Sequence, residues 1–414
     1  MKIFRLMIVA LALGALGAGC RKSPQEVERP ERIHSKRLVL YDSATYAKLA
    51  GLWEKYYDAY PSEDAYANWM YAAFYAQAVG AETMIDKGVE KYPANPVLLY
   101  LSARTKDWGP RSSEGSQLLI KATALDPEYM DPWHSLAVHY IVQGDRENAD
   151  VALRHLLSGG AIDDMIMDFS YNMISSLDTN SVLITNGDND TFPGWVLTRI
   201  IRYRPDVKIV NRALLNLDEY VLTIVKEGIP PFISKEGLDS LKSHHPADAA
   251  TPPGDRLLLR LVEACGRAGI PAYCACTIDN YGFWKSLPQA RALGLVTLVT
   301  PASIPRDVQV RKLLTTWMTV YRAEGLDGWQ LHAAGPASAA RALVPNYAAA
   351  LRALMPEIEA AGPDVQLSLF RWYRLHIMDL LDRNFVDKAN TMWFGPNRPR
   401  EIMEWARSKG RPGD

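Results

Sequence analysis

Prolines at turn positions recur at a near-constant spacing in the first third of this chain. Pro61, Pro93 and Pro127 are separated by 32 and then by 34 residues. The residues between them are apolar at the three- and four-residue spacing of an α-helix. A pair of helices repeated at this interval cannot bury its apolar face alone, so successive pairs must stack. The sequence therefore predicts an array of helical hairpins over residues 45–160.

The best-defined repeat lies between residues 133 and 153. Small Ala137 allows the two helices of the hairpin to approach each other, and Gly144 with Asp145 suits the turn between them. A weaker copy starts at Trp69. An array of this kind offers a groove to a peptide or protein partner, or it braces the next domain, and both interpretations remain open. The unit closely resembles the tetratricopeptide repeat through Trp133, Leu136, Ala137, Tyr140, Gly144, Ala149 and Leu153.

Short β-type runs alternate with amphipathic helices in the middle of the chain. This alternation favours a parallel sheet with right-handed crossovers. We therefore expect an α/β protein in which tetratricopeptide-like helical repeats are followed by a doubly wound, mostly parallel sheet domain at 161–305 and a C-terminal helical cap at 306–414. The expected strands are 181–185, 207–210, 270–278 and 295–299, and the expected helices are 194–203, 256–268, 287–293, 308–322, 337–355 and 365–381.

Polar side chains collect where the predicted strands end. In a parallel α/β sheet the carboxyl ends of the strands meet at one edge, and ligands bind in the crevice beyond that edge. We therefore expect these side chains to share a crevice. The candidate ligand-binding residues are Asn186, Asp188, Asn189, Asp190, Asn211, Asn216, Asp279 and Asn280.

The loop from Asn186 to Pro193 has two interpretations. As a binding site, its acidic and amide side chains would ligate a hard cation or hydrogen-bond the hydroxyls of a sugar. As a turn, the same residue types suit tight backbone geometry, and Asp190 or Thr191 would cap a helix that begins at Gly194. The two interpretations are compatible with each other.

The sequence contains no familiar catalytic signature. A glycine-rich phosphate loop, a nucleophile elbow and a His-Glu-x-x-His motif are all absent. Cys265, Cys274 and Cys276 fit buried small hydrophobic residues better than metal ligands. The pair His244-His245 lies in a loop without further ligands. We expect neither a metal nor a cofactor, and the sequence identifies no catalytic residue.

The first twenty residues have the layout of a secretory signal. Lys2 and Arg5 precede an apolar run that ends at Leu16, and small residues lead from there to Cys20. The run is shorter than the roughly 20 residues that a bilayer span needs. A cysteine at the cleavage point is typical of bacterial lipoproteins, and diacylation would supply the two chains that stable anchoring requires. A plain secreted protein or an anchor helix with a chance cysteine is the alternative.

We therefore expect residues 1–19 to be a lipoprotein signal peptide and Cys20 to be the lipidation site. The polar, proline-containing stretch that follows favours a tether over residues 20–44. These features predict a lipid-anchored, extracytoplasmic protein of the cell envelope, on the periplasmic face. The 46 Lys and Arg residues are balanced by 47 Asp and Glu residues, so we expect no broad basic surface for nucleic acid.

Four segments of the chain resemble a known bacterial family: Tyr171–Asn216, Pro271–Thr277, Leu293–Pro301 and Tyr321–Asp327. They are similar to the C-terminal extramembrane region of the protein O-mannosyltransferase-like glycosyltransferases, long described as a domain of unknown function. The resemblance implies an extracytoplasmic α/β domain flanked by helical repeats. In that family a multi-spanning membrane half is expected to carry the transferase chemistry. This sequence shows no such half, so we do not extend the activity to it.

Two functional hypotheses follow from these observations. The first is a lipid-anchored binding or scaffold protein in envelope glycan or glycoprotein assembly, with no catalysis of its own. Its expected partners are the membrane through the lipid anchor, a protein or peptide at the helical repeats, and a saccharide. The alternative is an enzyme that acts on a glycan or glycoconjugate through Asp188 and Asp190. Paired carboxylates suit glycoside chemistry only when they lie about 5–10 Å apart across a cleft.

The lipid anchor can be tested by replacing the cysteine that would carry it. We expect Cys20→Ser to release the protein from the membrane fraction, because the acyl chains then have no thiol to which they can be attached. Fractionation followed by a salt wash measures this release. A variant that still sediments with membranes after the wash would contradict the lipoprotein interpretation.

Overall fold

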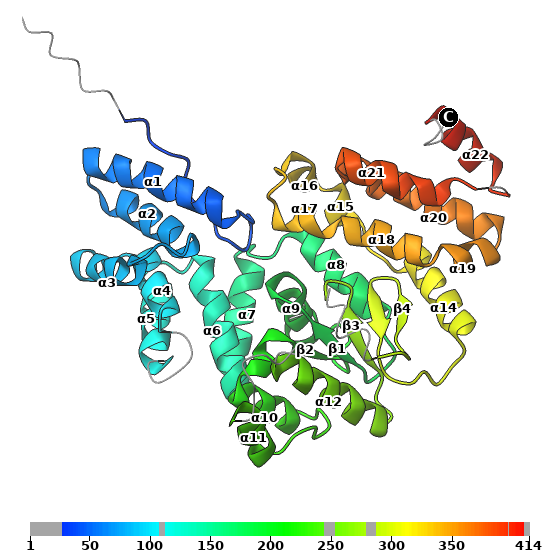
Figure 1. The fold of residues 1–414 in the computed structure, drawn as a ribbon, viewed down its shortest axis with the longest axis horizontal. Coiled ribbons are helices and arrows are strands. Elements are labelled where there is room, and N and C mark those ends of the chain that lie inside the picture. Colours follow the sequence, from blue (N-terminus) through cyan, green and yellow to red (C-terminus); the bar gives the residue numbers. More distant parts are fainter. Residues whose placement is uncertain (1–26, 107–111, 244–252, 279–286, 396, 410–414) are drawn as a thin grey trace, which may run out of the picture.

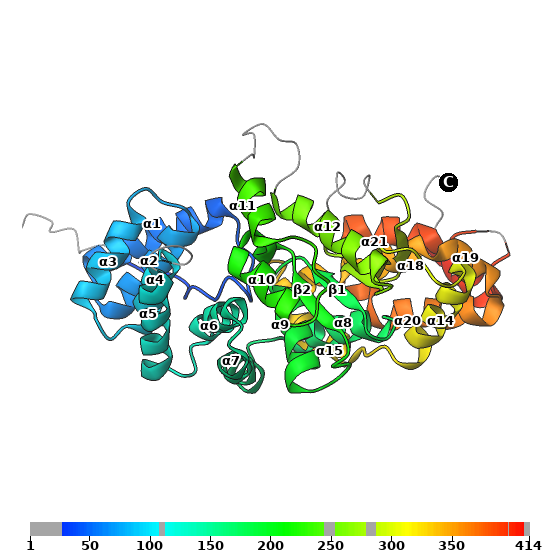
Figure 2. The same cartoon turned by 90° about the horizontal axis from the view of Figure 1, so that it is seen from below.

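The computed structural model describes residues 27–106, 112–243, 253–278, 287–395 and 397–409. The protein is mostly helical and contains one small mixed sheet. Figures 1 and 2 show a helical array at one end, the sheet in the middle and further helices at the other end. Within these described ranges, no helix is long and apolar enough to cross a membrane. The predicted signal peptide and Cys20 lie outside the described residues.

The first part of the described chain is an array of helices that pack on their neighbours in the sequence. Helices one, four and six of the array pack on helices two, five and seven respectively. The predicted helical array is therefore present over this region. The helices are α1 (Ser43–Ala59), α2 (Glu63–Tyr75), α3 (Ala81–Lys91), α4 (Pro96–Arg104), α5 (Ser112–Leu125), α6 (Met130–Gln143) and α7 (Arg146–Ser158).

Side-chain caps define where several of these helices begin. The side chains of Ser62, Asn95 and Asp145 accept hydrogen bonds from backbone N–H groups in the first turns of α2, α4 and α7. Each cap satisfies a donor that the helix itself leaves unpaired. Gly144 ends α6 in the left-handed conformation, with φ of 75°, so the chain turns at once into α7. The turn predicted at Gly144-Asp145 is confirmed.

The middle of the chain forms a five-stranded sheet with the strand order β2-β1-β3-β5-β4. Strand β1 pairs in parallel with β2 and β3, whereas β5 pairs antiparallel with both β3 and β4. The strands are β1 (Val182–Thr185), β2 (Lys208–Asn211), β3 (Ala272–Ala275), β4 (Arg291–Leu293) and β5 (Val296–Leu298). The intervening elements are α8 (Asp164–Ser175), α9 (Asp188–Trp195), η1 (Val196–Ile200), η2 (Ala213–Asn216), α10 (Asp218–Lys226), α11 (Lys235–Ser243) and α12 (Pro253–Arg267).

The sheet is mixed, which corrects the expectation of a mostly parallel one. The helix predicted over 287–293 is absent: part of that stretch forms β4, which turns directly into β5. The reason is Gly294, whose φ of 68° favours a two-residue hairpin between Leu293 and Val296. A hairpin makes β4 and β5 antiparallel to each other, and β5, which lies in the predicted strand at 295–299, also runs opposite to β3.

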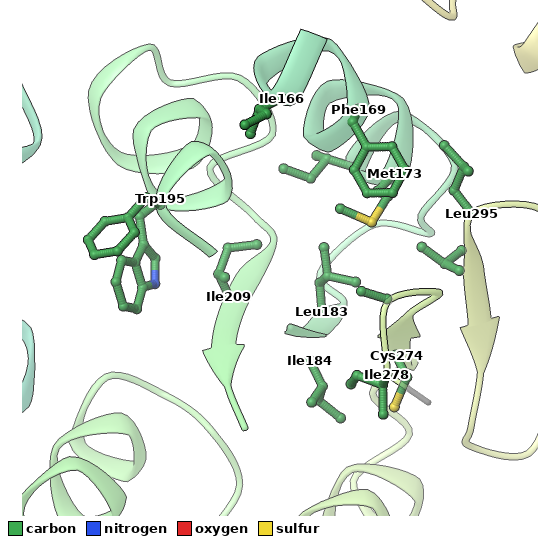
Figure 3. Packing of buried hydrophobic residues seen from close by; sticks show 14 of the residues in the cluster. Ile166, Phe169, Met173, Leu183, Ile184, Trp195, Ile209, Cys274, Ile278 and Leu295 are labelled. Carbon is green, nitrogen blue, oxygen red and sulfur yellow. The ribbon is translucent and has the colours of Figure 1, made fainter. Parts of the chain in front are cut away.

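Helices cover both faces of the sheet. Neighbouring residues of a strand point to opposite faces. Figure 3 shows Leu183 directed toward Phe169 and Met173 of α8, while Ile184 lies beside Cys274 on the other side. Helix α12 packs against β3. All residues of β1 and β3 are buried, as strands covered on both faces should be.

The C-terminal part is helical, as predicted, but it is divided into shorter pieces. The helix expected over 337–355 is broken by Pro345, which begins a new helix, and the next helix begins at Met355 with Pro356 in its first turn. Proline lacks the N–H that a continuous helix requires. The elements are α14 (Arg306–Thr319), α15 (Glu324–Asp327), α16 (Trp329–Ala333), α17 (Ala339–Leu343), α18 (Pro345–Ala353), α19 (Met355–Ala360), α20 (Pro363–His376), η3 (Met378–Leu380), α21 (Arg383–Asn390), η4 (Thr391–Trp393) and α22 (Arg400–Ser408).

Residues 27–42, which we call the N-terminal segment, pack along the helical array. The Lys36 N–H donates to the Tyr71 hydroxyl over 2.9 Å, and the Ile33 N–H donates to Asn68 Oδ1 over 3.0 Å. The segment then reaches α17, where Val39 forms an antiparallel bridge with Ser338. Figure 1 shows this dark-blue segment running from the array toward the C-terminal helices. The tether predicted over 20–44 is therefore wrong for residues 27–42, because their backbone groups are held by side chains distant in sequence.

The helical array is joined directly to the sheet region. The ring of His134 in α6 meets Phe192 of α9 edge to face, with 4.7 Å between ring centroids. The Thr223 hydroxyl of α10 donates to the carbonyl of Val142 over 3.0 Å. Arg199 in η1 forms an ion pair with Asp150 of α7, at 2.8 Å. These contacts fix how the array faces the sheet, and they thereby create the space described below.

The packing of α6 can be tested at Ala137, which is fully buried. We expect Ala137→Trp to lower the free energy of unfolding by about 1–3 kcal/mol, because the larger side chain overpacks the seam between α6 and α7. The matched control is Ala124→Trp, since Ala124 is exposed on α5. Thermal or urea unfolding of both variants measures the difference. Equal midpoints for the two variants would show that Ala137 does not lie in a packed seam.

Candidate functional site

The loop after β1 turns its second aspartate inward. Helix α9 begins at Asp188, directly after Gly187, and Asp190 occupies its third position. The two carboxylate oxygens of Asp190 accept the backbone N–H groups of Asn186 and Gly187, both over 2.8 Å. The Thr277 hydroxyl, which follows β3, also donates to this carboxylate. Asp190 is only 2% exposed, so burial raises its pKa, while these hydrogen bonds oppose that effect.

This geometry modifies the predicted helix cap. We expected Asp190 or Thr191 to precede a helix starting at Gly194, whereas α9 already begins at Asp188. Asp190 caps the helix from inside its first turn by reaching back to the loop amides, as the acidic residue of a capping box does. Its carboxylate is therefore fully engaged within the loop.

Asn211, at the end of β2, is also used internally. Its Nδ2 group donates to the Thr191 hydroxyl over 2.9 Å, and its Oδ1 accepts the Leu214 N–H over 3.0 Å. Asn216 is exposed and donates to the carbonyl of Ala213, while Asn189 is partly exposed at the start of α9. Asp279 and Asn280 lie outside the described residues. The structure thus brings Asn186, Asp190 and Asn211 together, but through contacts that use their polar atoms.

The crevice between β1 and β3 is bridged by hydrogen bonds. Asn186 Nδ2 donates to the Thr277 carbonyl over 3.0 Å, and Arg212 Nη1 donates to Asn186 Oδ1 over 3.3 Å. Arg212 also forms an ion pair with the buried carboxylate of Asp255, at 2.6 Å. Thr277, Arg212 and Asp255 were not among the residues predicted from the sequence. Arg212 was within reach of the same strand-end argument, because it follows Asn211 directly.

Asp188 points in a different direction from Asp190. Its carboxylate is 50% exposed and lies 3.0 Å from Nε of Arg37, in the N-terminal segment. Arg37 also contacts Asp131 at 3.4 Å and the Tyr100 hydroxyl at 3.3 Å. Burial alone would lower the pKa of Arg37, but the acidic groups of Tyr100, Asp188 and Asp131 hold it above its ordinary value. Arg37 therefore stays charged.

Asp131 is the buried acceptor at the centre of this contact. Its carboxylate accepts hydrogen bonds from the hydroxyls of Ser35 at 2.5 Å, Tyr71 at 3.0 Å and Tyr129 at 3.3 Å. Burial and the nearby carboxylate raise the pKa of Tyr71, so its hydroxyl remains a donor. No sequence pattern pairs Asp131 with the N-terminal segment, because 94 residues separate it from Arg37.

An open cleft lies between the helical array and the carboxyl ends of the strands. Its volume is about 430 Å³, and its walls come from α4, α5 and α6 on one side and from the region of η2 and α10 on the other. Asp188 and Arg37 border it. The polar residues of its lining are Arg37, Arg104, Ser112, Ser116, Ser135, His139, Gln143, Asp188 and Glu219, and the apolar residues are Leu119, Val138, Val142, Leu214 and Leu217.

The described residues contain no cluster of three or more His, Cys, Asp or Glu side chains placed to hold a metal ion. Cys265 and Cys274 are buried. Burial raises the pKa of the Cys265 thiol to about 11 and that of Cys276 to about 12. Protonated, buried thiols behave as small hydrophobic groups, in agreement with the sequence argument. His244-His245 lies outside the described residues.

Comparison with known proteins supports part of the resemblance. The family described as TMEM260-associated domain 2, which is linked to O-mannosyltransferase-like proteins, matches residues 166–227. The match runs from α8 to the end of α10 and contains the whole loop after β1. Comparison with curated proteins gives no match.

The opposite roles of the two aspartates predict opposite effects on stability. We expect Asp190→Asn to lower the free energy of unfolding by about 1–3 kcal/mol, because one loop amide loses its acceptor. Asp188→Asn is the matched control. We expect a smaller loss there, because Asp188 is half exposed and Arg37 keeps Asp131 as its partner. Urea unfolding of both variants measures the difference, and an equal or larger loss at Asp188 would contradict this assignment.

Proposed function

We propose that this protein is a lipid-anchored, extracytoplasmic binding protein that holds a saccharide in the cleft between its helical array and its sheet. On this proposal it acts as a scaffold in envelope glycan or glycoprotein assembly and carries out no catalysis of its own. The anchor would be Cys20, and the protein would lie on the periplasmic face of the cell envelope. The helical array would also be the surface for a protein or peptide partner.

The observation that supports binding is the chemistry of the cleft. Its volume of about 430 Å³ falls in the range of small-molecule sites. Hydroxyl, amide and imidazole side chains in its lining suit a hydroxyl-rich ligand, and Val138, Val142 and Leu217 offer apolar surface for the ring faces of a sugar. Arg37 and Asp188 at the border place one cation and one carboxylate within reach of the same ligand.

The geometry of the loop favours binding over glycoside chemistry. A glycosidase needs two carboxyl groups that face each other across the bound sugar. Asp188 borders the cleft, but both oxygens of Asp190 are held by the amides of Asn186 and Gly187. Asp190 is therefore unsuited to attack, or to exchange protons with, a ligand in the cleft. The engaged carboxylate of Asp190 therefore favours binding over the enzymatic alternative.

Two finer structural assignments belong to the same proposal. We take α2 with α3, α4 with α5, and α6 with α7 as three tetratricopeptide-like units. Their support is the near-34-residue spacing of the prolines and the tight α6–α7 turn. We take strands β1, β2 and β3 with the helices on both faces as a doubly wound core. The match at 166–227 supports a relation to the extramembrane region of the O-mannosyltransferase-like glycosyltransferases.

Calorimetry on the purified full chain tests saccharide binding. The titrants are a panel of acidic and neutral oligosaccharides, with Ca²⁺ and Mg²⁺ alone as separate arms. We expect at least one oligosaccharide to bind, and we expect Ser116→Trp to abolish that binding because the indole fills the cleft. Ser113→Trp is the matched control, since Ser113 is exposed on the same helix and is not part of the cleft lining. Absence of saccharide binding, or equal binding by both variants, would refute the proposal.

A further inference from the structure

A second cleft lies on the far side of β2 from β1. Its volume is about 290 Å³, and it is bounded by α7, η1, β2 and α10. It shares no lining residue with the cleft of the proposed function. Most of its lining falls within the matched segment 166–227. Its charged lining residues are Arg146, Asp150, Arg199, Arg202, Lys208 and Glu227.

The free edge of the sheet contributes a backbone donor to this cleft. Strand β2 is the outermost strand on its side. The N–H groups of Lys208 and Arg212 bond to the carbonyls of Ser181 and Thr185, so the backbone of Ile209, one position on, faces away from β1. The next outward N–H, on Asn211, is taken by the Tyr220 hydroxyl at 3.0 Å. Ile209 is among the lining residues, so its outward N–H lies on the side of the sheet where the cleft is.

Cations outnumber acids around this donor. Four basic side chains and two acidic ones line the cleft. Arg199 lies 2.8 Å from Asp150, and Arg146 lies 3.6 Å from Glu227, so these two pairs are largely balanced. The remaining positive charge comes from Lys208, whose ammonium also donates to the Glu227 carbonyl at 2.6 Å, and from the exposed Arg202. The rim thus carries a net positive charge that suits an anion.

The chain around Arg199 and Arg202 has an unusual backbone. Residues 196–200 form a π-helix, a form that is rare and frequent at functional sites. Arg202 and Arg204 then adopt left-handed conformations, with φ of 63° and 49°. Such conformations are unfavourable for non-glycine residues and persist only where the surroundings hold them. Arg204 is held by Asp206 at 2.8 Å and by the carbonyl of Asp178 at 2.8 Å.

The buried lining residues that carry no charge include four large apolar or aromatic side chains. They are Trp195, Tyr220, Ile224 and Ile229. A ligand that contacts both the charged rim and these apolar residues must therefore place an anionic group at the rim and an apolar ring against the apolar residues. Arginine and lysine together with a backbone N–H are the groups that bind phosphate oxygens in proteins.

We infer that this cleft binds a phosphate monoester whose phosphate contacts Arg202, Lys208 and the Ile209 N–H, and whose esterified group is an apolar or aromatic ring. The phosphate at the rim satisfies the excess of positive charge. The ring covers the apolar lining residues, which inorganic phosphate alone leaves uncovered. This inference does not depend on the saccharide cleft.

Calorimetry of the full chain with phenyl phosphate, inorganic phosphate and phenol tests this inference. We expect phenyl phosphate to bind more tightly than either of the others, and its binding to weaken with added salt. The double variant Arg202→Gln/Lys208→Gln is expected to weaken phenyl phosphate binding at least tenfold. The matched control is Arg154→Gln, because Arg154 is exposed on α7 and lies outside the cleft lining.

The outcomes separate this site from the other cleft. Ser116→Trp is expected to leave phenyl phosphate binding unchanged, since Ser116 lines only the saccharide cleft. Far-ultraviolet circular dichroism and thermal midpoints check that the double variant is folded. Binding of inorganic phosphate as tightly as phenyl phosphate would overturn the inference, as would equal affinities for the wild type and the folded double variant.

Discussion

The guanidinium of Arg37 connects three parts of the chain that are distant from one another in sequence. It comes from the N-terminal segment, and it lies 3.4 Å from Asp131 at the start of α6 and 3.0 Å from Asp188 at the start of α9. The Arg37 side chain is only 12% exposed, and a charge so largely removed from water is tolerated beside opposite charges and hydrogen-bond partners. Since its two carboxylates belong to the helical array and to the sheet region, Arg37 adds an ionic contact to the packing that fixes how the array faces the sheet. Arg37 also borders the larger cleft between the array and the sheet.

The elements that were predicted correctly are those whose structure depends on residues close together in the sequence. The helical array, the end of α6 at Gly144 and the strands β1, β2 and β3 were all predictable from local apolar period and turn residues. The β4–β5 hairpin was missed, although Gly294 marks it, because a short apolar run after a turn fits a helix as well as a strand. The N-terminal segment was unpredictable for a different reason. Its partners, such as Tyr71 and Ser338, are distant in sequence, and its composition is that of a linker.

The candidate site shows the same division. As predicted from the positions of the strand ends, Asn186, Asp190 and Asn211 lie at one edge of the sheet. The direction of their side chains was not predictable in this way, because it depends on where α9 begins. If α9 began one residue earlier or later, its side chains would point in other directions. The aspartate that is buried against the amides and the one that borders the cleft would then change. The cleft is lined by Arg37 and by residues of α4, α5 and α6. These parts lie next to the sheet region only because of tertiary packing, so the cleft was not predictable from local sequence.

If Cys20 carries the proposed lipid, the packed N-terminal segment would limit how far the folded protein can stand from a membrane. Arg29, which pairs with Asp64 of α2 at 2.7 Å, is only nine positions from Cys20. An extended chain advances about 3.3–3.6 Å per residue, so a lipid on Cys20 would keep α2 within roughly 30 Å of the bilayer surface. Such a short connection would confine the protein to a thin layer next to the membrane, and it could bind only partners within that layer. Molecules that are themselves embedded in the same membrane would then meet the protein far more often than molecules free in solution.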